Sequence, residues 1–313
     1  MKTKTNFLVS GNSWSRTLRI GVLAFLFSAC GSGGNGNYVS QDDSVIHISA
    51  DESFKPIIDS QIQVYESSNP DIRIIAHYKS EQDCMKDMLV DSIRMVIVTR
   101  GLSEKEAAFY RDTIGHSIAW ERLAYDAMAI IVNNEAPDSL FTFEEIRSIL
   151  RGDDDRFQPV FDGLQATSNV RFAIDSVLRG EKLTDKAIAA KSSEELIDFV
   201  ARNKKAMGFI GVSWVGNRAD SRLLSFDENV KVAAVQTLKP DDLGFVKPYQ
   251  ANIATKRYPL VRSLYYIAKE NYIGPARKFA NFMGAERGQL IFRRAYLWPA
   301  KMDFTIRKAN APE

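Results

Sequence analysis

Hydroxyl and guanidinium side chains recur in this sequence where a run of apolar, β-branched residues gives way to a helical pattern. They are Ser53 beside Phe54, Thr99 beside Arg100, and Thr167 beside Ser168. At such a junction the first N–H groups of the helix have no partner within the helix, and the helix dipole adds about half a positive charge. These junctions therefore support the capture of an oxyanion by several oriented donors.

The second junction shows the pattern in most detail. The apolar run 95–98 is too short for a helix and predicts a buried strand. Ser103 and Glu106 then predict a capping box at the start of a helix. Arg100 adds a planar guanidinium suited to an oxyanion. An alternative is that Thr99 and Arg100 only cap a surface turn, but the repetition of the pattern at two other junctions favours an anion site.

Residues 1–29 have the features of a secretory signal. They carry four basic residues and no acid, and the apolar stretch 20–27 is too short to span a bilayer. Small residues precede Cys30, and a segment rich in Gly, Ser and Asn follows it. This pattern resembles a bacterial lipoprotein signal, so we expect a lipid on Cys30 and a flexible tether over residues 30–43. An ordinary signal peptide cleaved near Ala29 is the alternative.

Removal of this signal changes the charge balance of the chain. The full sequence has 41 basic and 39 acidic residues, and the loss of four basic residues takes the formal net charge from +2 to −2. A domain so near neutrality is not suited to non-specific nucleic-acid binding. If Cys30 carries a lipid, Cys84 has no cysteine to pair with, and its helical spacing places it in the core.

The rest of the chain alternates between strand-like and helix-like segments, which predicts an α/β fold with largely parallel sheets. Its length is sufficient for two lobes with their own cores. The expected strands are 44–50, 72–78, 95–98, 116–120, 123–132 and 206–215. The expected helices are 56–68, 81–91, a helix after Ser103, 141–150, 170–180, 193–203, 275–283 and 286–295.

Six segments, in their order and spacing, carry a resemblance to a known family. They are ADESFKP (50–56), IVTRGLS (97–103), LAYDAMAIIVN (123–133), FTFEEIRSILRG (141–152), AMGFIG (206–211) and RYPL (257–260). This order resembles that of the periplasmic phosphate-binding proteins of ABC importers, in a lipoprotein form. The resemblance extends from about residue 45 to 300, which is essentially the whole domain after the tether.

The resemblance implies a two-lobed α/β fold, in which each lobe is a mixed sheet flanked by helices and crossover strands join the lobes. The first lobe would comprise residues 44–124 and 250–313, and the second lobe residues 125–249. Phosphate would bind in the cleft to the hydroxyls and N–H groups at the three junctions already named. The expected protein is a monomer on the extracytoplasmic face of a bacterial membrane, held by its N-terminal lipid, that delivers phosphate to permease subunits without a cofactor.

Two other classes of function are alternatives to phosphate capture. The same fold could act as a ligand sensor or scaffold with reduced anion binding, and Glu52 and Phe161 near the expected cleft favour that alternative. An enzyme is not expected, and neither is a metal site, because the three histidines, His47, His77 and His116, lack metal-ligand spacing. The sequence also has no phosphate-binding Walker loop.

Overall fold

A computed structural model describes residues 44–163, 167–240, 242 and 244–302, all of which belong to one compact unit. The predicted signal peptide, the lipidation site Cys30 and the tether 30–43 lie outside the described residues. The predicted boundaries of the two lobes, residues 44–124 with 250–313 and residues 125–249, stay predictions. Within the described ranges, no helix combines the length and apolar character that crossing a membrane requires.

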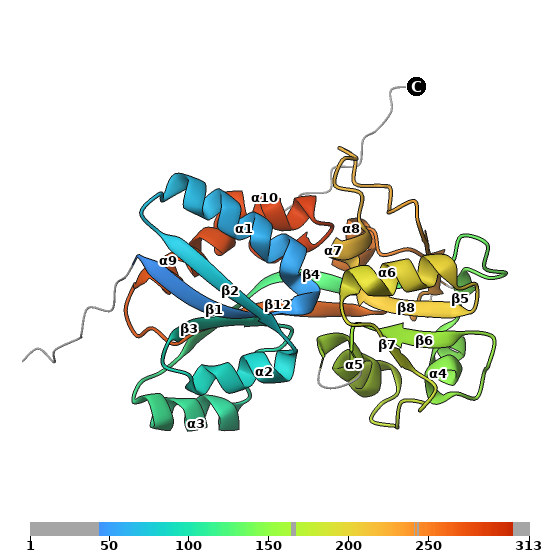
Figure 1. The fold of residues 1–313 in the computed structure, drawn as a ribbon, viewed down its shortest axis with the longest axis horizontal. Coiled ribbons are helices and arrows are strands. Elements are labelled where there is room, and N and C mark those ends of the chain that lie inside the picture. Colours follow the sequence, from blue (N-terminus) through green and yellow to red (C-terminus); the bar gives the residue numbers. More distant parts are fainter. Residues whose placement is uncertain (1–43, 164–166, 241, 243, 303–313) are drawn as a thin grey trace, which may run out of the picture. The chain divides into compact units, whose positions relative to one another are not determined.

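The principal sheet is mixed, and its strand order is β2, β1, β3, β12, β4, β8, β6, β7 (Figure 1). The strands are β1 (Val45–Asp51), β2 (Arg73–Lys79), β3 (Ile93–Val98), β4 (Ala119–Val132), β6 (Gln158–Phe161), β7 (Ile188–Ala189), β8 (Ala206–Gly211) and β12 (Val261–Ala268). β1 pairs with β2 and β3 in parallel, and β6 pairs with β7 and β8 in parallel. β12 is antiparallel to β3 and β4, and β4 is antiparallel to β8. The expectation of largely parallel sheets was wrong for these central strands.

β4 and β12 lie between two halves of the sheet. We define the first half as β1 to β3 with the helices that cover them, and the second half as β6 to β8 with theirs. β4 is one 14-residue strand that pairs with β12 over its first part and with β8 over its last part. The sequence predicted two separate extended segments here. The polar pair Glu121 and Arg122 does not interrupt the strand, because this stretch is not buried and can carry polar side chains.

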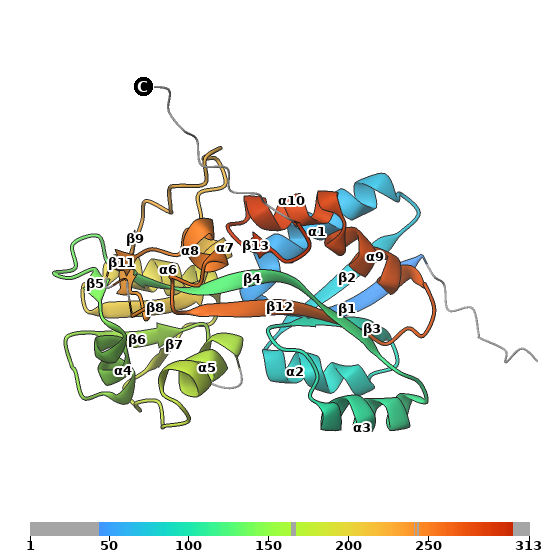
Figure 2. The same ribbon diagram turned by 180° about the vertical axis from the view of Figure 1, so that it is seen from behind.

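Helices cover both faces of the sheet in each half (Figures 1 and 2). In the first half α1 (Lys55–Ser68), α9 (Pro275–Gly284) and α10 (Glu286–Arg294) lie on one face, and α2 (Glu81–Lys86) and α3 (Glu104–Ile114) lie on the other. In the second half α6 (Ser193–Arg202) lies opposite α4 (Phe143–Arg151) and α5 (Ser168–Phe172). The remaining short elements are α7 (Val212–Val215), α8 (Gln250–Ala254), β5 (Leu140–Phe141), β9 (Lys231–Val232), β10 (Ala234–Gln236), β11 (Phe245–Val246) and β13 (Trp298–Pro299).

Local signals located several helix ends correctly. Ser103 and Glu106 form the predicted capping box of α3, with both reciprocal hydrogen bonds present. α4 begins at an equivalent box and ends before Gly152, whose φ of 87° is in the left-handed region that glycine tolerates.

Three predicted elements differ from the observed ones. The predicted strand 206–215 ends at Gly211, and residues 212–215 form α7. The predicted helix 170–180 is the short α5 followed by a π-helical turn, Ala173–Val177. The predicted helix 81–91 ends at Lys86 and continues as a 3₁₀ turn. Most apolar residues of the three segments are buried, although Leu89 and Val90 are exposed. The pattern of backbone hydrogen bonds changes within each segment, because the apolar run is too short for its periodicity to define one element.

Candidate functional site

Two of the predicted ligand residues meet in a buried cluster between the halves. Ser53 lies in the turn between β1 and α1, Ser168 begins α5, and their Oγ atoms are 3.3 Å apart although the residues are separated by 115 positions. Asn169 Nδ2 donates to Ser53 Oγ at 3.2 Å and to Asp162 Oδ2 at 2.9 Å. All four side chains are buried. The fold thus brings hydroxyl and amide donors of distant segments to one point.

Asp162, which directly follows β6, is the acceptor around which this cluster is arranged. Its Oδ2 accepts hydrogen bonds from Ser53 Oγ at 3.3 Å and from Ser193 Oγ at 3.4 Å, in addition to the bond from Asn169. Burial raises the pKa of Asp162, and the hydrogen bond from Asn169 opposes that increase. Three hydrogen bonds to a single oxygen are an arrangement that an oxygen of a bound anion could also adopt.

Arg262 on β12 supplies positive charge to the cluster. Its Nε donates to Asp126 Oδ2 at 2.7 Å and its Nη1 donates to Ser168 Oγ at 3.0 Å. The guanidinium lies over the ring of Phe54, 5.0 Å from the centroid. Among the described residues its buried Nη2 has no hydrogen-bond partner, and a Cβ added at Gly211 would lie 3.3 Å from that nitrogen. Burial opposes the charged form, but the neighbouring carboxylates outweigh it and raise the pKa of Arg262.

Asp51 makes the cluster sensitive to pH. The residue is 2% exposed, and its Oδ1 accepts the N–H of Ser53 at 2.9 Å. Burial, followed by repulsion from Glu81, raises the pKa of Asp51 to about 7, although Arg262 and Ser168 act in the opposite direction. Near neutral pH this carboxyl group therefore carries a proton part of the time.

Thr99, a third predicted ligand residue, belongs to a neighbouring cluster with Glu81 and Arg171. Glu81 Oε1 accepts the Thr99 N–H at 2.9 Å and also its hydroxyl, while Arg171 Nη2 donates to Thr99 Oγ1 at 2.6 Å. Arg171 Nε also donates to Glu81 Oε2. Burial alone would raise the pKa of Glu81, but the bonds from Arg171 and Thr99 lower it. An internal carboxylate thus occupies the donors of Thr99.

The Arg100 side chain is directed toward α3, the helix that follows it in the chain. Its two terminal nitrogens donate to the two carboxylate oxygens of Glu106 at 2.8 Å each, so the guanidinium fork is engaged within the first half. The hydrogen bonds between the two side chains raise the pKa of Arg100 and lower the pKa of Glu106 to about 2. The structure therefore does not bring Arg100 into hydrogen-bond contact with the Ser53 cluster.

The remaining sequence candidates have local roles. Thr167 caps α5, because its hydroxyl accepts the Val170 N–H at 3.3 Å. Phe54 is fully buried beneath Arg262. Phe161 is in the core and stacks on Phe209, with centroids 4.9 Å apart.

Two of the three histidines, which the sequence did not predict to meet, are in contact with each other. His47 and His77 lie on the adjacent strands β1 and β2, with His47 Nδ1 3.0 Å from His77 Nε2 and the rings stacked. Their sequence spacing gave no sign of this contact, which depends on strand register. In the part of the chain that the structure describes, no group of three His, Cys, Asp or Glu side chains is placed to hold a metal ion.

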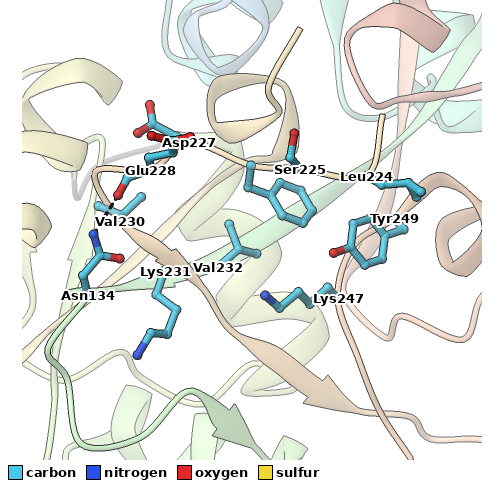
Figure 3. Close-up of a pocket in the computed structure, with 11 residues that line it drawn as sticks. Asn134, Leu224, Ser225, Asp227, Glu228, Val230, Lys231, Val232, Lys247 and Tyr249 are labelled. Carbon is cyan, nitrogen blue, oxygen red and sulfur yellow. Dashed lines mark hydrogen bonds between the residues drawn. The ribbon is translucent and has the colours of Figure 1, made fainter. Parts of the chain in front are cut away.

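A surface hollow of about 380 Å³ lies in a different part of the molecule (Figure 3). It is lined mainly by the segment from Leu224 to Val232, with Asn134, Lys247 and Tyr249. None of the predicted ligand residues lines it. The buried cluster is the better candidate site, because it combines several convergent polar groups with perturbed pKa values, as binding sites do.

Comparisons with known proteins place this fold. A sequence profile described as a PBP superfamily domain matches residues 35–287, most of the chain. The chain belongs to the PBP superfamily. Among curated proteins none matches it.

Solved structures of similar fold agree with this assignment. One is from Clostridium perfringens, assigned as a phosphate ABC transporter substrate-binding protein and containing bound phosphate; it is 20% identical, with a TM-score of 0.67 over 82% of this chain and 100% of that one. Another, an ABC-type phosphate transport receptor from Vibrio cholerae, is 19% identical, with a TM-score of 0.61 over 81% of this chain and 99% of that one. At such identity the likeness shows the two-lobed α/β fold expected from the sequence.

Within this PBP superfamily member, sequence reasoning did not identify several residues of the cluster. Asp162 directly follows β6 and Asn169 is the second residue of α5, and no local pattern in the sequence marks either as a site residue. Arg262 is on a crossover strand more than ninety residues from Ser168, and only the pairing of β12 with β4 brings it to the cluster. The signal that could have identified it is an arginine within the mostly apolar segment that forms β12, since a charged side chain is rarely buried without a partner.

Proposed function

We propose that this protein is a lipid-anchored extracytoplasmic solute-binding protein that captures inorganic phosphate or a related oxyanion and delivers it to the permease subunits of an ABC importer. The anion would bind between the halves, at Ser53, the N–H of Phe54, Ser168 and the neighbouring donors of Thr99, Arg100 and Thr167. Asn169 and Arg262 would add an amide and a guanidinium to this set. Cys30 would carry the lipid.

The main support is the convergence of Ser53, Ser168 and Arg262 in one buried cluster, where one guanidinium nitrogen has no hydrogen-bond partner among the described residues. Hydroxyl and guanidinium donors held in a site shielded from water are the groups that bind an oxyanion tightly, because they replace its hydration at little reorganisation cost. The solved structure with bound phosphate in the same fold is consistent with this assignment.

The carboxylates of the cluster determine which form of the anion the site accepts. Asp51, Asp126 and Asp162 surround a single arginine, so a dianion is repelled unless a proton is shared with one of them. The pKa of Asp51, about 7, allows that proton to be supplied near neutral pH. Phosphate affinity should therefore be higher at pH 6 than at pH 8.

The decisive experiment is isothermal titration of the full chain, purified in mild detergent, against phosphate, sulfate and molybdate at fixed salt. Micromolar phosphate binding is expected for the wild type, with a loss of about tenfold or more in Arg262→Lys, which keeps the charge but removes the second donor. Arg100→Ala is the companion variant. Unchanged affinity in Arg100→Ala would remove that residue from the site, and a folded wild type that binds none of the three anions would contradict the proposal.

A non-transport sensor or scaffold is the second candidate function. Glu81 favours it, because this buried carboxylate already accepts the N–H and hydroxyl of Thr99 and the guanidinium of Arg171. A site whose donors are occupied by the protein itself has less free energy to offer an external anion. Absence of anion binding from the folded chain would favour this function.

A further inference from the structure

The strongest additional feature of the molecule is a pair of carboxylates that connect the two halves in opposite directions. Glu81 belongs to the first half and is bonded to Arg171 of the second. Asp162 belongs to the second half and accepts a hydrogen bond from Ser53 of the first. Each carboxylate therefore accepts donors from both halves, as a ligand bridging two lobes would.

The donor sets resemble those offered to a bound oxyanion. Glu81 accepts a backbone N–H, a hydroxyl and a guanidinium, and Asp162 accepts two hydroxyls and an amide. Both carboxylates are deeply buried, with side-chain exposure of 3% for Glu81 and residue exposure of 6% for Asp162. Buried charges persist only when they are paired or well hydrogen-bonded, so these bonds are required wherever the halves are in contact.

We propose that Glu81 and Asp162 act as built-in anions, which hold the two halves closed without ligand and compete with an external oxyanion for the same donors. The inference rests on the proposed function, because it concerns the same site. In a binding protein that closes on its ligand, the ligand supplies the free energy that favours the closed state. Here the protein supplies that free energy itself, and an entering anion must displace a carboxylate.

Other bonds across the halves support a closed resting state. Trp214 Nε1, after β8, donates to the backbone oxygen of Ser53 at 2.8 Å. Ser53 and Ser168 are within hydrogen-bond reach of each other, so no anion is needed between these two hydroxyls. A partner that recognises the closed form would therefore bind this protein whether or not the anion is present.

The chain contains a matched control for Glu81. Glu145 also accepts the N–H and hydroxyl of one threonine, Thr142, and a guanidinium, that of Arg156. All three residues of this second set lie within the second half, in and around α4. Glu145→Gln removes the same charge from the same kinds of donor without affecting the contact between the halves.

The test measures the distance between the halves by pulsed electron resonance. Nitroxide labels are placed at Asp112→Cys in α3 and Lys182→Cys beyond α5, both strongly exposed, in the full chain with Cys30→Ser. Cys84 stays unlabelled, because it is buried and burial raises its pKa. The distribution is recorded with and without inorganic phosphate for the wild type, for Glu81→Gln with Asp162→Asn, and for Glu145→Gln.

The expected wild-type distribution is the same with and without phosphate. The double variant should show a longer mean distance, with the closed-to-open ratio reduced about tenfold or more, because the ion pair of Glu81 with Arg171 and the hydrogen bond of Asp162 with Ser53 are both weakened. Glu145→Gln should match the wild type. Calorimetry should show stronger phosphate binding by the double variant than by the wild type. If the double variant does not fold, Glu81→Gln alone is used with the same expectation.

Three outcomes would overturn the proposal: a wild-type distance that shortens when phosphate is added, a double variant with the wild-type distribution, or a Glu145→Gln chain that opens equally. The proposed function is decided separately by calorimetry. If the wild type is closed without ligand and neither the wild type nor the double variant binds phosphate, the result would support the built-in anions and contradict phosphate capture. If the wild type closes only when phosphate binds, the result would support capture and contradict the built-in anions.

Discussion

At the scale of single residues, the site combines donors for an anion with carboxylates that repel one. Arg262 is neutralised by Asp126, and Glu81 is neutralised by Arg171. Among the described residues Asp51 forms no ion pair, and burial, which outweighs the attraction of Arg262, shifts its titration toward neutrality. The charge of the cluster then depends on the proton of Asp51 and on those of Asp126 and Asp162, because burial raises the pKa of all three carboxyl groups.

Replacing Asp51 by asparagine tests this charge state through stability. The pKa of Asp51 is about 7 in the folded chain against 3.8 as its ordinary value, so the folded state binds the proton more tightly. Folding stability from this group is present at low pH and is lost as pH rises toward 7, by about 4 kcal/mol at most. Asp51→Asn should therefore be more stable than the wild type at pH 8 and near the wild type at pH 4.

Urea unfolding at both pH values measures this difference. Asparagine keeps an acceptor for the N–H of Ser53, so the capping bond is retained in the variant. An equal difference between variant and wild type at the two pH values would show that Asp51 does not titrate with a raised pKa.

At the scale of elements, the close contact between two helices limits which residue one position can carry. α9 and α10 meet at Gly288, where an added Cβ would lie 2.3 Å from Phe282 O and 2.5 Å from Met283 Cα. Both neighbours are backbone atoms, so they cannot turn aside as a side chain would. Gln61 Nε2 also donates to the oxygen of Gly288, which fixes α1 against α10.

Gly288→Ala should destabilise the protein by about 2 kcal/mol or more, because the helices must separate to admit the methyl group. Gly284→Ala is the matched control, since nothing lies within 4 Å of the corresponding Cβ. That variant should be neutral or slightly more stable, as alanine favours helix over glycine. Thermal or urea unfolding of both variants measures the difference, and equal stabilities would show that α9 and α10 do not meet as described.

At the scale of the whole molecule, the contact between the halves depends on a few buried polar bonds. The bridge between Arg171 and Glu81 pairs a partly exposed guanidinium with a buried carboxylate. Loss of the guanidinium would leave a buried charge without its partner, which costs more than the pair itself contributes.

Arg171→Gln should lower stability by about 2 kcal/mol at pH 7, a value reduced because Arg171 is partly exposed. The pKa of Glu81 is lowered in the folded chain, so its contribution is present above its ordinary value of 4.5 and is lost as pH falls through the lowered value. The difference between variant and wild type should therefore decrease as the pH falls below 4.5. Urea titrations at pH 7 and pH 3.5 measure it, and a difference that is not smaller at the lower pH would contradict a role for the Glu81 charge.

The sequence by itself determined the order of most strands and helices, the capping of α3, and two residues of the cluster, Ser53 and Ser168. These features depend on local patterns, such as apolar periodicity and the hydroxyl and glycine residues at helix ends. Only the tertiary structure decided that β4 is one strand, that Arg100 pairs with Glu106, and that Asp162, Asn169 and Arg262 complete the cluster. The position of Arg262 depends on strand pairing and on a contact between segments about a hundred residues apart, which no local pattern encodes. Arg100 with Glu106 and Asp162 with Asn169 are close in the sequence, but these pairs depend on the directions of side chains, which apolar periodicity does not specify.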